Sequence, residues 1–263
     1  MAGDVWLQSL VKVMPKFFFS PNDVKDGFIH ISGETAHHLL HVLRVKLGGE
    51  VLLCDGLGLD YYAELVESSS KTKHSVAVFK IKSTSPCDTE PITRITLFQS
   101  LPKGDKMDLI IQKCVELGVH EIQPVLTERS VARISSNEKK TARFQKISES
   151  AAEQSKRGII PIIHPPCGFS AAIEAATESP ATLVLLAYEQ EHERSLKSVL
   201  LNNPTPQKNI SLWIGPEGGF TDNEVSALCN AGAITITLGR RVLRTETAAI
   251  ATIAQIICLC EEA

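Results

Sequence analysis

The sequence predicts an α/β protein with two domains, a small N-terminal β-barrel and a larger domain built on a parallel sheet. Two observations carry this prediction. In residues 15–85, short apolar stretches are separated by turn residues, which is the pattern of a small barrel. From Arg94 onward, apolar strands alternate with segments of helical periodicity, which is the pattern of a parallel sheet covered by helices.

The N-terminal domain, expected over residues 15–85, carries five strand patterns and one helical pattern. The helix is expected over 34–47, because Ala36, Leu40, Leu43 and Leu47 form an apolar stripe at helical spacing. The segment 83–91 contains two prolines and is the best candidate for a linker. The expected strands cover residues 16–20, 28–31, 50–54, 61–67 and 74–81.

The second domain, expected over residues 92–263, alternates six strands with six helices. From Ala248 to Cys260 the chain is apolar almost all round, which indicates a helix buried in the core. The expected strands cover 94–100, 121–126, 159–164, 182–188, 209–214 and 233–238, and the expected helices cover 105–117, 137–157, 168–177, 193–201, 221–231 and 246–260.

One strand of this domain leads into the loop Gly215-Pro216-Glu217-Gly218-Gly219 and then into a sharply started helix. Thr221 with Glu224 has the pattern of a capping box, and Phe220 with Val225 that of a hydrophobic staple. The loop is no phosphate loop and no dinucleotide fingerprint, because the residues that those motifs require are missing. Such strand–loop–helix junctions are where open α/β sheets bind ligands.

A second loop of the same kind, 239–247, follows the strand at 233–238 and contains Arg240, Arg241 and Arg244. The two junctions are expected to form two walls of one pocket. The arginines either pair with nearby carboxylates or bind an anion, and the second interpretation is favoured for Arg244.

The composition, with 43% hydrophobic and 22% charged residues in a chain of 263, is that of an ordinary globular protein. No apolar stretch is long enough to cross a membrane. The seven cysteines are expected to be reduced core residues of a cytoplasmic protein, or of an organellar one if residues 1–14 are a targeting remnant. His37 and His41 have metal-ligand spacing, but no third ligand is evident, so no metal site is expected.

Charge is distributed unevenly along the chain. The net charge is −3, yet residues 101–157 carry 11 Lys and Arg against 8 Asp and Glu. A positive segment in an acidic chain is a weak indication of contact with a nucleic-acid backbone. Each cation alone is an ordinary solvated charge, and only their concentration favours RNA. The candidates are Arg44, Lys103, Lys106, Lys113, Arg129 and Arg157.

Several stretches together carry a specific resemblance. They are 214–219 and 238–247, with 103–106, 112–119, 128–130, 152–155 and the Val-Leu-Arg core of 38–48. On these residues the chain resembles the SPOUT-superfamily methyltransferases that methylate N3 of a uridine in 16S ribosomal RNA, the RsmE family. The resemblance implies a catalytic domain with a trefoil knot, a PUA-like barrel that grips RNA, and a homodimer. It also implies that the RNA is met within an assembled or nearly assembled small subunit.

The resemblance implies S-adenosyl-L-methionine as cofactor. This molecule has no phosphate and therefore needs no phosphate-binding lysine. Backbone groups of the loops would form hydrogen bonds with the polar edge of its adenine, and apolar side chains would pack against the adenine ring. Arg244 or Arg129 is expected to stabilise a uracil anion and Glu217 to orient a group, whereas no general base is evident. The expected cofactor-binding residues are Ala187, Ile214, Gly215, Pro216, Glu217, Gly218, Gly219, Leu238, Gly239, Val242, Leu243, Arg244 and Thr245.

Three alternatives stay open. One is another methylation by the same superfamily, such as ribose 2′-O-methylation. A second is a non-catalytic RNA-binding or ribosome assembly protein with an inactive cofactor site. A third is a small-molecule enzyme on a generic α/β fold, which the basic segment 101–157 and the barrel disfavour.

Overall fold

The computed structural model describes residues 16–71, 74–130, 137–178, 182–202 and 209–261. The chain divides into an N-terminal unit of residues 1–90 with 156–159, and a C-terminal unit of residues 91–155 with 160–263. The extension before Pro15, for which the sequence offers a targeting remnant as one interpretation, lies outside the described residues.

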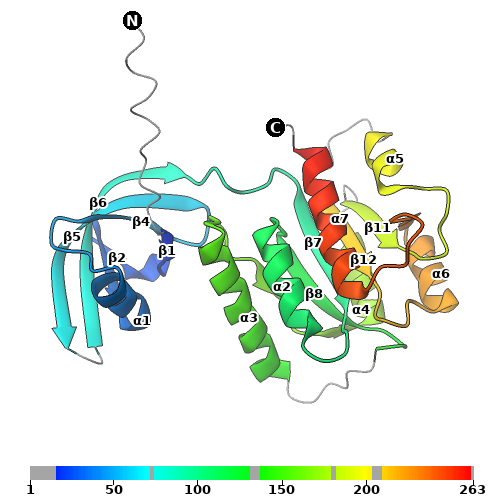
Figure 1. Ribbon diagram of the computed structural model, residues 1–263, viewed down its shortest axis with the longest axis horizontal. Coiled ribbons are helices and arrows are strands. Elements are labelled where there is room, and N and C mark those ends of the chain that lie inside the picture. Colours follow the sequence, from blue (N-terminus) through cyan, green and yellow to red (C-terminus); the bar gives the residue numbers. More distant parts are fainter. Residues whose placement is uncertain (1–15, 72–73, 131–136, 179–181, 203–208, 262–263) are drawn as a thin grey trace, which may run out of the picture. The chain divides into compact units, whose positions relative to one another are not determined.

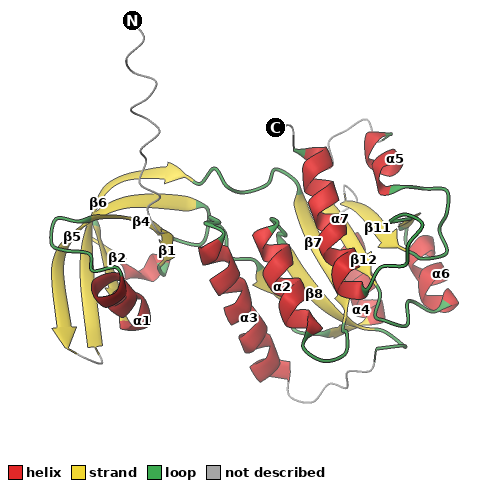
Figure 2. Cartoon of the chain, viewed as in Figure 1, coloured by secondary structure: helices red, strands yellow, loops and turns green. Residues whose placement is uncertain are grey.

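The N-terminal unit is a six-stranded mixed sheet in the order β1-β4-β5-β6-β3-β2 (Figure 2). Strand β1 runs parallel to β4, and the other pairs are antiparallel. One face buries an apolar cluster that includes Phe17, Ile29, Leu53 and Phe79. The strands are β1 (Lys16–Phe18), β2 (Val24–Lys25), β3 (Phe28–Ser32), β4 (Glu50–Cys54), β5 (Leu59–Lys71) and β6 (His74–Pro86).

The five expected strands are confirmed, while β2 was not expected. The linker prediction is wrong for residues 83–86, because β6 continues to Pro86. These residues pair with the start of β5, which extends to Leu59. Proline at the end of a strand is tolerated, since it need not donate to the ladder.

The expected helix over 34–47 is shorter than predicted. It consists of α1 (Gly33–His37) and the π-helical turn η3 (His38–Val42), and Arg44 then adopts a positive φ of 56°. A π-helical turn shifts every following side chain around the axis. Ala36 and Leu39, three residues apart and so on one helical face, are buried. The expected stripe is wrong beyond that point, since Leu47 is 65% exposed.

The segment 156–159 belongs to the N-terminal unit because Glu90 binds it. Its carboxylate pairs with the Arg157 guanidinium at 2.5 Å, and its Oε1 accepts hydrogen bonds from the backbone N–H groups of Gly158 (2.8 Å) and Ile159 (3.1 Å). Burial alone would raise the pKa of Glu90, but Arg157 and the two N–H groups outweigh it and lower the pKa.

The C-terminal unit is a parallel sheet in the order β10-β8-β7-β12-β11-β13, with β9 paired to β8 (Figure 1). The expected strands are confirmed, although β9 is shorter than 159–164 and β10 was not expected. The strands are β7 (Arg94–Ser100), β8 (Glu121–Leu126), β9 (Ile162–Ile163), β10 (Cys167–Gly168), β11 (Thr182–Ala187), β12 (Asn209–Ile214) and β13 (Ile234–Ile236).

Helices cover both faces of this sheet. Neighbouring residues of a strand point to opposite faces. Phe98 stacks on Trp213 beneath α4 and α6, whereas Gln99 faces Thr245 on α7. The six expected helices are confirmed, with ends within a few residues. They are α2 (Lys106–Glu116), α3 (Asn137–Gln154), α4 (Phe169–Thr177), α5 (Leu196–Leu201), α6 (Asp222–Asn230) and α7 (Thr245–Cys260).

Helix α7 is buried on one side only. Ala249, Ile253 and Ile256 are fully buried, but Cys258 is exposed. The prediction of a helix enclosed all round is therefore wrong for its outer face. The prediction of core cysteines holds for Cys54 and Cys114 but not for Cys229 and Cys258, and all seven cysteines are free. Within the described ranges, no helix is long and apolar enough to cross a bilayer.

Candidate active site

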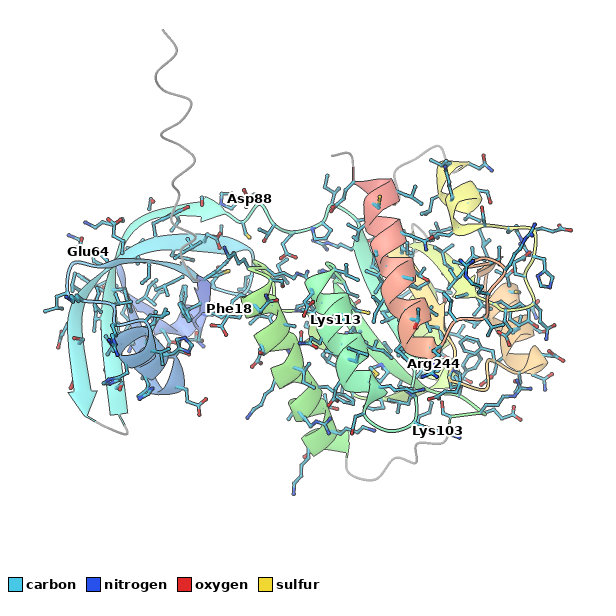
Figure 3. All side chains as sticks on the ribbon, in the orientation of Figure 1. Phe18, Glu64, Asp88, Lys103, Lys113 and Arg244 are labelled. Carbon is cyan, nitrogen blue, oxygen red and sulfur yellow. The ribbon has the colours of Figure 1, made fainter. Side chains whose placement is uncertain are left out.

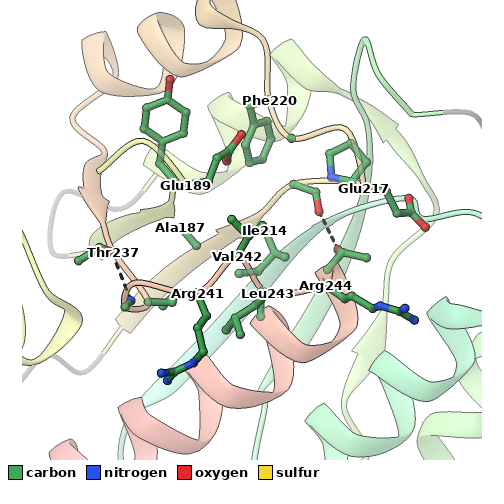
Figure 4. Close-up of a pocket in the computed structure, with 18 of the residues that line it drawn as sticks. Ala187, Glu189, Ile214, Glu217, Phe220, Thr237, Arg241, Val242, Leu243 and Arg244 are labelled. Carbon is green, nitrogen blue, oxygen red and sulfur yellow. Dashed lines mark hydrogen bonds between the residues drawn. The ribbon is translucent and has the colours of Figure 1, made fainter. Parts of the chain in front are cut away.

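The four neighbouring strands β7, β12, β11 and β13 end at the same edge of the parallel sheet, so the loops that follow them gather there. The loops after β11, β12 and β13, together with Lys106 at the start of α2, line a cavity of about 570 Å³ (Figure 4). All thirteen residues expected to bind the cofactor line this cavity: Ala187, Ile214, Gly215, Pro216, Glu217, Gly218, Gly219, Leu238, Gly239, Val242, Leu243, Arg244 and Thr245. The two glycine loops thus form two walls of one pocket, as the sequence predicts.

The first loop is tied to the core by a buried hydroxyl. Thr245 Oγ1 donates to the carbonyl oxygen of Gly215 at 2.6 Å and accepts from Gln99 Nε2 at 2.9 Å. Gln99 is fully buried and Thr245 is 5% exposed. This chain joins strand β7, the glycine loop and the start of α7, and it fixes the floor of the cavity.

The outer side of the same loop is held by Arg129. Its Nη1 donates to the carbonyl oxygens of Gly218 (2.7 Å) and Phe220 (3.2 Å). The expected capping box is present, since Thr221 and Glu224 exchange hydrogen bonds. Glu224 also accepts from the N–H of Glu128 at 2.8 Å, which anchors the segment that carries Arg129.

Glu217 is held on the cavity wall by α2. Its Oε1 accepts from Lys106 Nζ at 2.7 Å and from the N–H of Lys103 at 3.2 Å, and Lys106 also lies 3.6 Å from Glu246. Burial would raise the pKa of Glu217, but these donors outweigh it and lower the pKa. Glu217 is therefore an ionised, oriented carboxylate and a weak base.

Two glycines of this loop leave little room for a side chain. Gly219 has a φ of +67°, and a Cβ there would lie 2.5 Å from Glu189 Oε1. A Cβ on Gly215 would lie 3.2 Å from the ring of Phe220. By contrast, a Cβ on Gly218 would meet only Arg129 at 3.4 Å, an ordinary contact. Gly219 is the position at which substitution acts on the cavity most directly.

Three arginines of the second loop, Arg240, Arg241 and Arg244, line the cavity with exposed side chains. Within the described part of the chain, their guanidinium groups make no ion pair and no hydrogen bond. Arg244 is also the N-cap residue of α7, where the positive end of the helix dipole lies. The wall formed by this loop is therefore suited to an anion.

Sequence reasoning missed several residues of the site. Arg129 was expected to meet substrate, but its role in holding the loop was not foreseen, and Gln99 was overlooked. The cavity is also lined by Tyr188, Glu189, His192, Phe220, Thr237 and Ala248. Tyr188 and Glu189 directly follow strand β11, so the strand-end rule that located the two glycine loops could have found them.

The expected RNA-binding residues do not form one group. Lys103 and Arg244 lie at the same end of the C-terminal unit, whereas Lys113 lies about two turns further along α2, paired with Glu116 at 2.9 Å (Figure 3). Arg44 is exposed in the N-terminal unit. Arg157 contradicts the expectation: it is 3% exposed and neutralised by Glu90, so it is a structural residue.

A further group of cations lies on α3. Four exposed basic residues lie within the first ten residues of this helix, after Glu138, while Glu149 and Glu153 lie in its C-terminal half. Cations near a helix N-terminus oppose the helix dipole, so this placement does not serve helix stability. Arg143 pairs with Asp108 of α2. We call this group the α3 basic stripe: Lys139, Lys140, Arg143 and Lys146.

Two family models match the chain. A model described as an RNA methyltransferase domain matches residues 88–257, and one described as an RNA methyltransferase PUA domain matches residues 31–77. Together with the sheet orders above, these matches confirm the predicted fold class, a parallel α/β domain preceded by a PUA-like domain. The trefoil knot stays a prediction.

Curated relatives are similar over most of the chain. A protein of Synechocystis sp. named Ribosomal RNA small subunit methyltransferase E is 34% identical over 242 residues, which cover 92% of this chain and 77% of the relative. A protein of Bacillus subtilis with the same name is 35% identical over 223 residues, which cover 83% of this chain and 85% of the relative.

Solved structures agree. The Ribosomal RNA small subunit methyltransferase E of Neisseria gonorrhoeae, bound to S-adenosyl methionine, has 34% identity and a TM-score of 0.79, covering 94% of this chain and 98% of that one. A methyltransferase of Legionella pneumophila, in complex with the same cofactor, has 29% identity and a TM-score of 0.77, covering 92% and 96%.

Proposed function

Since this chain belongs to the family of ribosomal RNA small subunit methyltransferase E, we propose that it methylates N3 of a uridine in small-subunit ribosomal RNA. The methyl donor is S-adenosylmethionine. The single observation that carries the proposal is the cavity at the ends of three parallel strands, lined by all thirteen residues expected from the motifs.

The residues that line the cavity are suited to this cofactor. The glycine loop presents backbone without Cβ atoms, and Ile214, Leu238 and Leu243 offer apolar surface for a ring. Arg240 and Arg241, whose guanidinium groups have no acceptor among the described residues, complement the cofactor's carboxylate, and no phosphate-binding lysine motif is present. When bound, S-adenosylmethionine supplies an electrophilic methyl group on a sulfonium centre.

The residues around the cavity have separate tasks in this proposal. N3 of uracil carries a proton that must leave, and the negative charge then spreads over the two carbonyl oxygens. Arg244, with no acceptor among the described residues and at the N-terminus of α7, stabilises that anion. Glu217, ionised and held by Lys106, orients the reacting groups. Arg129 is better suited to position the glycine loop than to meet substrate, since two carbonyl oxygens occupy its Nη1.

N3 lies on the Watson–Crick edge, so the target uridine must be unpaired or turned out of its helix. The flanking RNA backbone needs cations near the cavity. Lys103 is exposed beside the cavity, and α3 packs on α2, whose first residue, Lys106, lines the cavity. We therefore include the α3 basic stripe in the RNA surface and omit Arg157.

The remaining expectations belong to the same proposal. The protein acts as a homodimer on an assembled or nearly assembled small subunit, its C-terminal segment forms the trefoil knot, and it works in the cytoplasm. Sedimentation analysis tests the oligomeric state, and comparison of naked RNA with subunits as substrates tests the assembly state. Among the described residues, no three His, Cys, Asp or Glu side chains gather as metal ligands would.

Product analysis tests the reaction. Small subunits that lack the modification are incubated with the protein and S-adenosylmethionine carrying a labelled methyl group, and the digested RNA is examined by mass spectrometry. We expect 3-methyluridine. A 2′-O-methylnucleoside would establish the other methylation, and intact cofactor binding without any product would favour the non-catalytic RNA-binding protein.

A matched pair of variants tests the role of Arg244. Arg244→Ala should lower the turnover rate by about 100-fold, the effect of removing one donor to a developing anion. Arg241→Ala, at an equally exposed lining position of the same loop, should leave the turnover rate at saturating cofactor nearly unchanged. Full turnover by Arg244→Ala with unchanged cofactor affinity would disprove the anion-stabilising role.

A further inference from the structure

Glu189 is a cavity carboxylate that has no partner among the described residues. It lies two residues after the end of β11 and lines the cavity with an exposed side chain. Within the described residues it accepts no hydrogen bond and forms no ion pair. The other lining carboxylate, Glu217, is already held by Lys106 and by the N–H of Lys103.

The carboxylate of Glu189 lies close against the glycine loop. A Cβ on Gly219 would be 2.5 Å from its Oε1 and 3.3 Å from its Cδ. A ligand that fills the cavity beside this loop would therefore displace water from Glu189. A carboxylate that loses its water requires new hydrogen-bond donors, so the group of the ligand that faces Glu189 must carry them.

The charged residues on the cavity walls indicate which end of the cofactor faces Glu189. Glu189 and Phe220 lie on one side of the cavity, and Arg241 and Arg244 lie on the other (Figure 4). Arg241 complements the α-carboxylate of the methionine moiety. The α-ammonium group is bonded to the same carbon atom as that carboxylate, so it stays on the arginine side. The nucleoside half is left for the Glu189 side.

The nucleoside half offers a vicinal diol with two hydroxyl donors, and a carboxylate with two oxygens can accept from both. Charge-assisted bonds of this kind are about twice as strong as neutral ones. Acidic side chains after a strand bind ribose hydroxyls in this way in dinucleotide-binding folds. We propose that Glu189 recognises the ribose 2′- and 3′-hydroxyls of the cofactor. This rests on the proposed function, because it takes S-adenosylmethionine as the ligand.

Binding of the ribose hydroxyls by Glu189 can be distinguished from a general attraction of its carboxylate for positive charge. A carboxylate that attracted the sulfonium or the ammonium group would bind the cofactor whatever the state of its ribose. A carboxylate that binds the diol makes affinity depend on the 2′-hydroxyl. The coupling between Glu189 and that hydroxyl is therefore the quantity to measure.

The test is a thermodynamic cycle in which both the protein and the ligand are changed, with affinities measured by isothermal titration calorimetry. S-adenosylhomocysteine and its 2′-deoxy analogue, which share the methionine tail, are titrated into the wild type, Glu189→Gln and Glu193→Gln. Glu193 is an exposed glutamate of the same loop that does not line the cavity, so it is the matched control. The wild type and Glu193→Gln should bind the deoxy analogue about tenfold more weakly than S-adenosylhomocysteine, the effect of one hydrogen bond to a charged group.

Glu189→Gln, which keeps one acceptor oxygen but loses the charge, should bind S-adenosylhomocysteine about tenfold more weakly than the wild type and should discriminate much less against the deoxy analogue. Equal weakening of both ligands would overturn the ribose assignment, because Glu189 would then meet another part of the cofactor. Unchanged affinity in Glu189→Gln would overturn any cofactor contact. A wild type that binds neither S-adenosylmethionine nor S-adenosylhomocysteine would refute the proposed function itself, which is a distinct outcome.

Discussion

Replacing Thr245 by valine removes the hydroxyl that joins the glycine loop to the core while keeping the shape of the side chain. The hydroxyl donates to the carbonyl oxygen of Gly215 at 2.6 Å and accepts from Gln99 Nε2 at 2.9 Å. Gln99 is fully buried, so water does not replace the lost partner there. Gln99 Nε2 keeps its bond to the carbonyl oxygen of Ser100 at 2.9 Å.

The magnitude follows from these contacts. Two hydrogen bonds are lost, each contributing about 1 kcal/mol net, and the Gly215 carbonyl is left either unsatisfied or forced to move toward water. We expect the free energy of unfolding to fall by about 2 kcal/mol, which is about 4–8 °C in melting temperature for a unit of this size. The displaced loop should raise the dissociation constant of S-adenosylmethionine about tenfold.

Thermal unfolding and calorimetric titration measure the two effects. The matched control is Thr252→Val on the same helix, where a fully buried hydroxyl donates to the carbonyl oxygen of Ala248 at 2.7 Å and contacts no loop. This variant should lose about 1 kcal/mol of stability and bind the cofactor normally. If Thr245→Val binds S-adenosylmethionine as tightly as Thr252→Val does, the Thr245 hydroxyl does not hold the glycine loop in place for the cofactor.

Three further predictions concern the surroundings of the site. Glu90→Gln removes the carboxylate charge that pairs with the buried Arg157 and should lower the free energy of unfolding, measured by urea titration, by about 3 kcal/mol, whereas Glu64→Gln, at a partly exposed position, should change it little. Because the pKa of Glu90 is lowered in the folded protein, this contribution is present above the unfolded pKa and lost as pH falls through the folded pKa, so Glu90→Gln should flatten the acid side of the stability profile; an unchanged profile would contradict this. Neutralising the three lysines of the α3 basic stripe should weaken binding to small-subunit RNA and reduce the slope of log affinity against log salt concentration by about 2. Cofactor affinity should stay unchanged, and Lys197→Ala on α5 is the control. An unchanged slope would exclude the stripe from the RNA surface. Arg129→Gln should raise the cofactor's dissociation constant about tenfold because the glycine loop loses its clamp, and a loss of turnover at unchanged affinity would instead assign Arg129 to the substrate.

The parallel sheet and its cavity could be predicted from the sequence because both depend on local patterns. Strands 94–100, 121–126 and 209–214 were predicted with the bounds that the structure has. Strands of a parallel sheet end at one edge, so the two glycine loops had to meet there. The capping box at Thr221 and Glu224 depends only on residues three apart.

The errors arise where tertiary contacts override local pattern. The stripe expected over 36–47 requires one continuous helix, but the helical segment ends at Val42, so that Leu43 and Leu47 are 38% and 65% exposed. Arg157 has the composition of a surface cation and is buried because Glu90, far away in sequence, captures it. That Glu189 has no partner among the described residues could not be predicted either, because this depends on which cations lie nearby in space.

The central claim is that the cavity between the two glycine loops holds S-adenosylmethionine, and a calorimetric titration of Gly219→Val tests it most directly. Gly219 combines a φ of +67° with a Cβ position 2.5 Å from Glu189 Oε1, at the cavity wall. Gly232→Val is the control, because Gly232 has a φ of +96° and nothing within 4 Å of its Cβ position, so it adds strain away from the cavity. We expect S-adenosylmethionine to bind tightly to the wild type and to Gly232→Val, and at least tenfold more weakly to Gly219→Val. Equal affinity in all three proteins would contradict the claim, because the cofactor would then bind elsewhere.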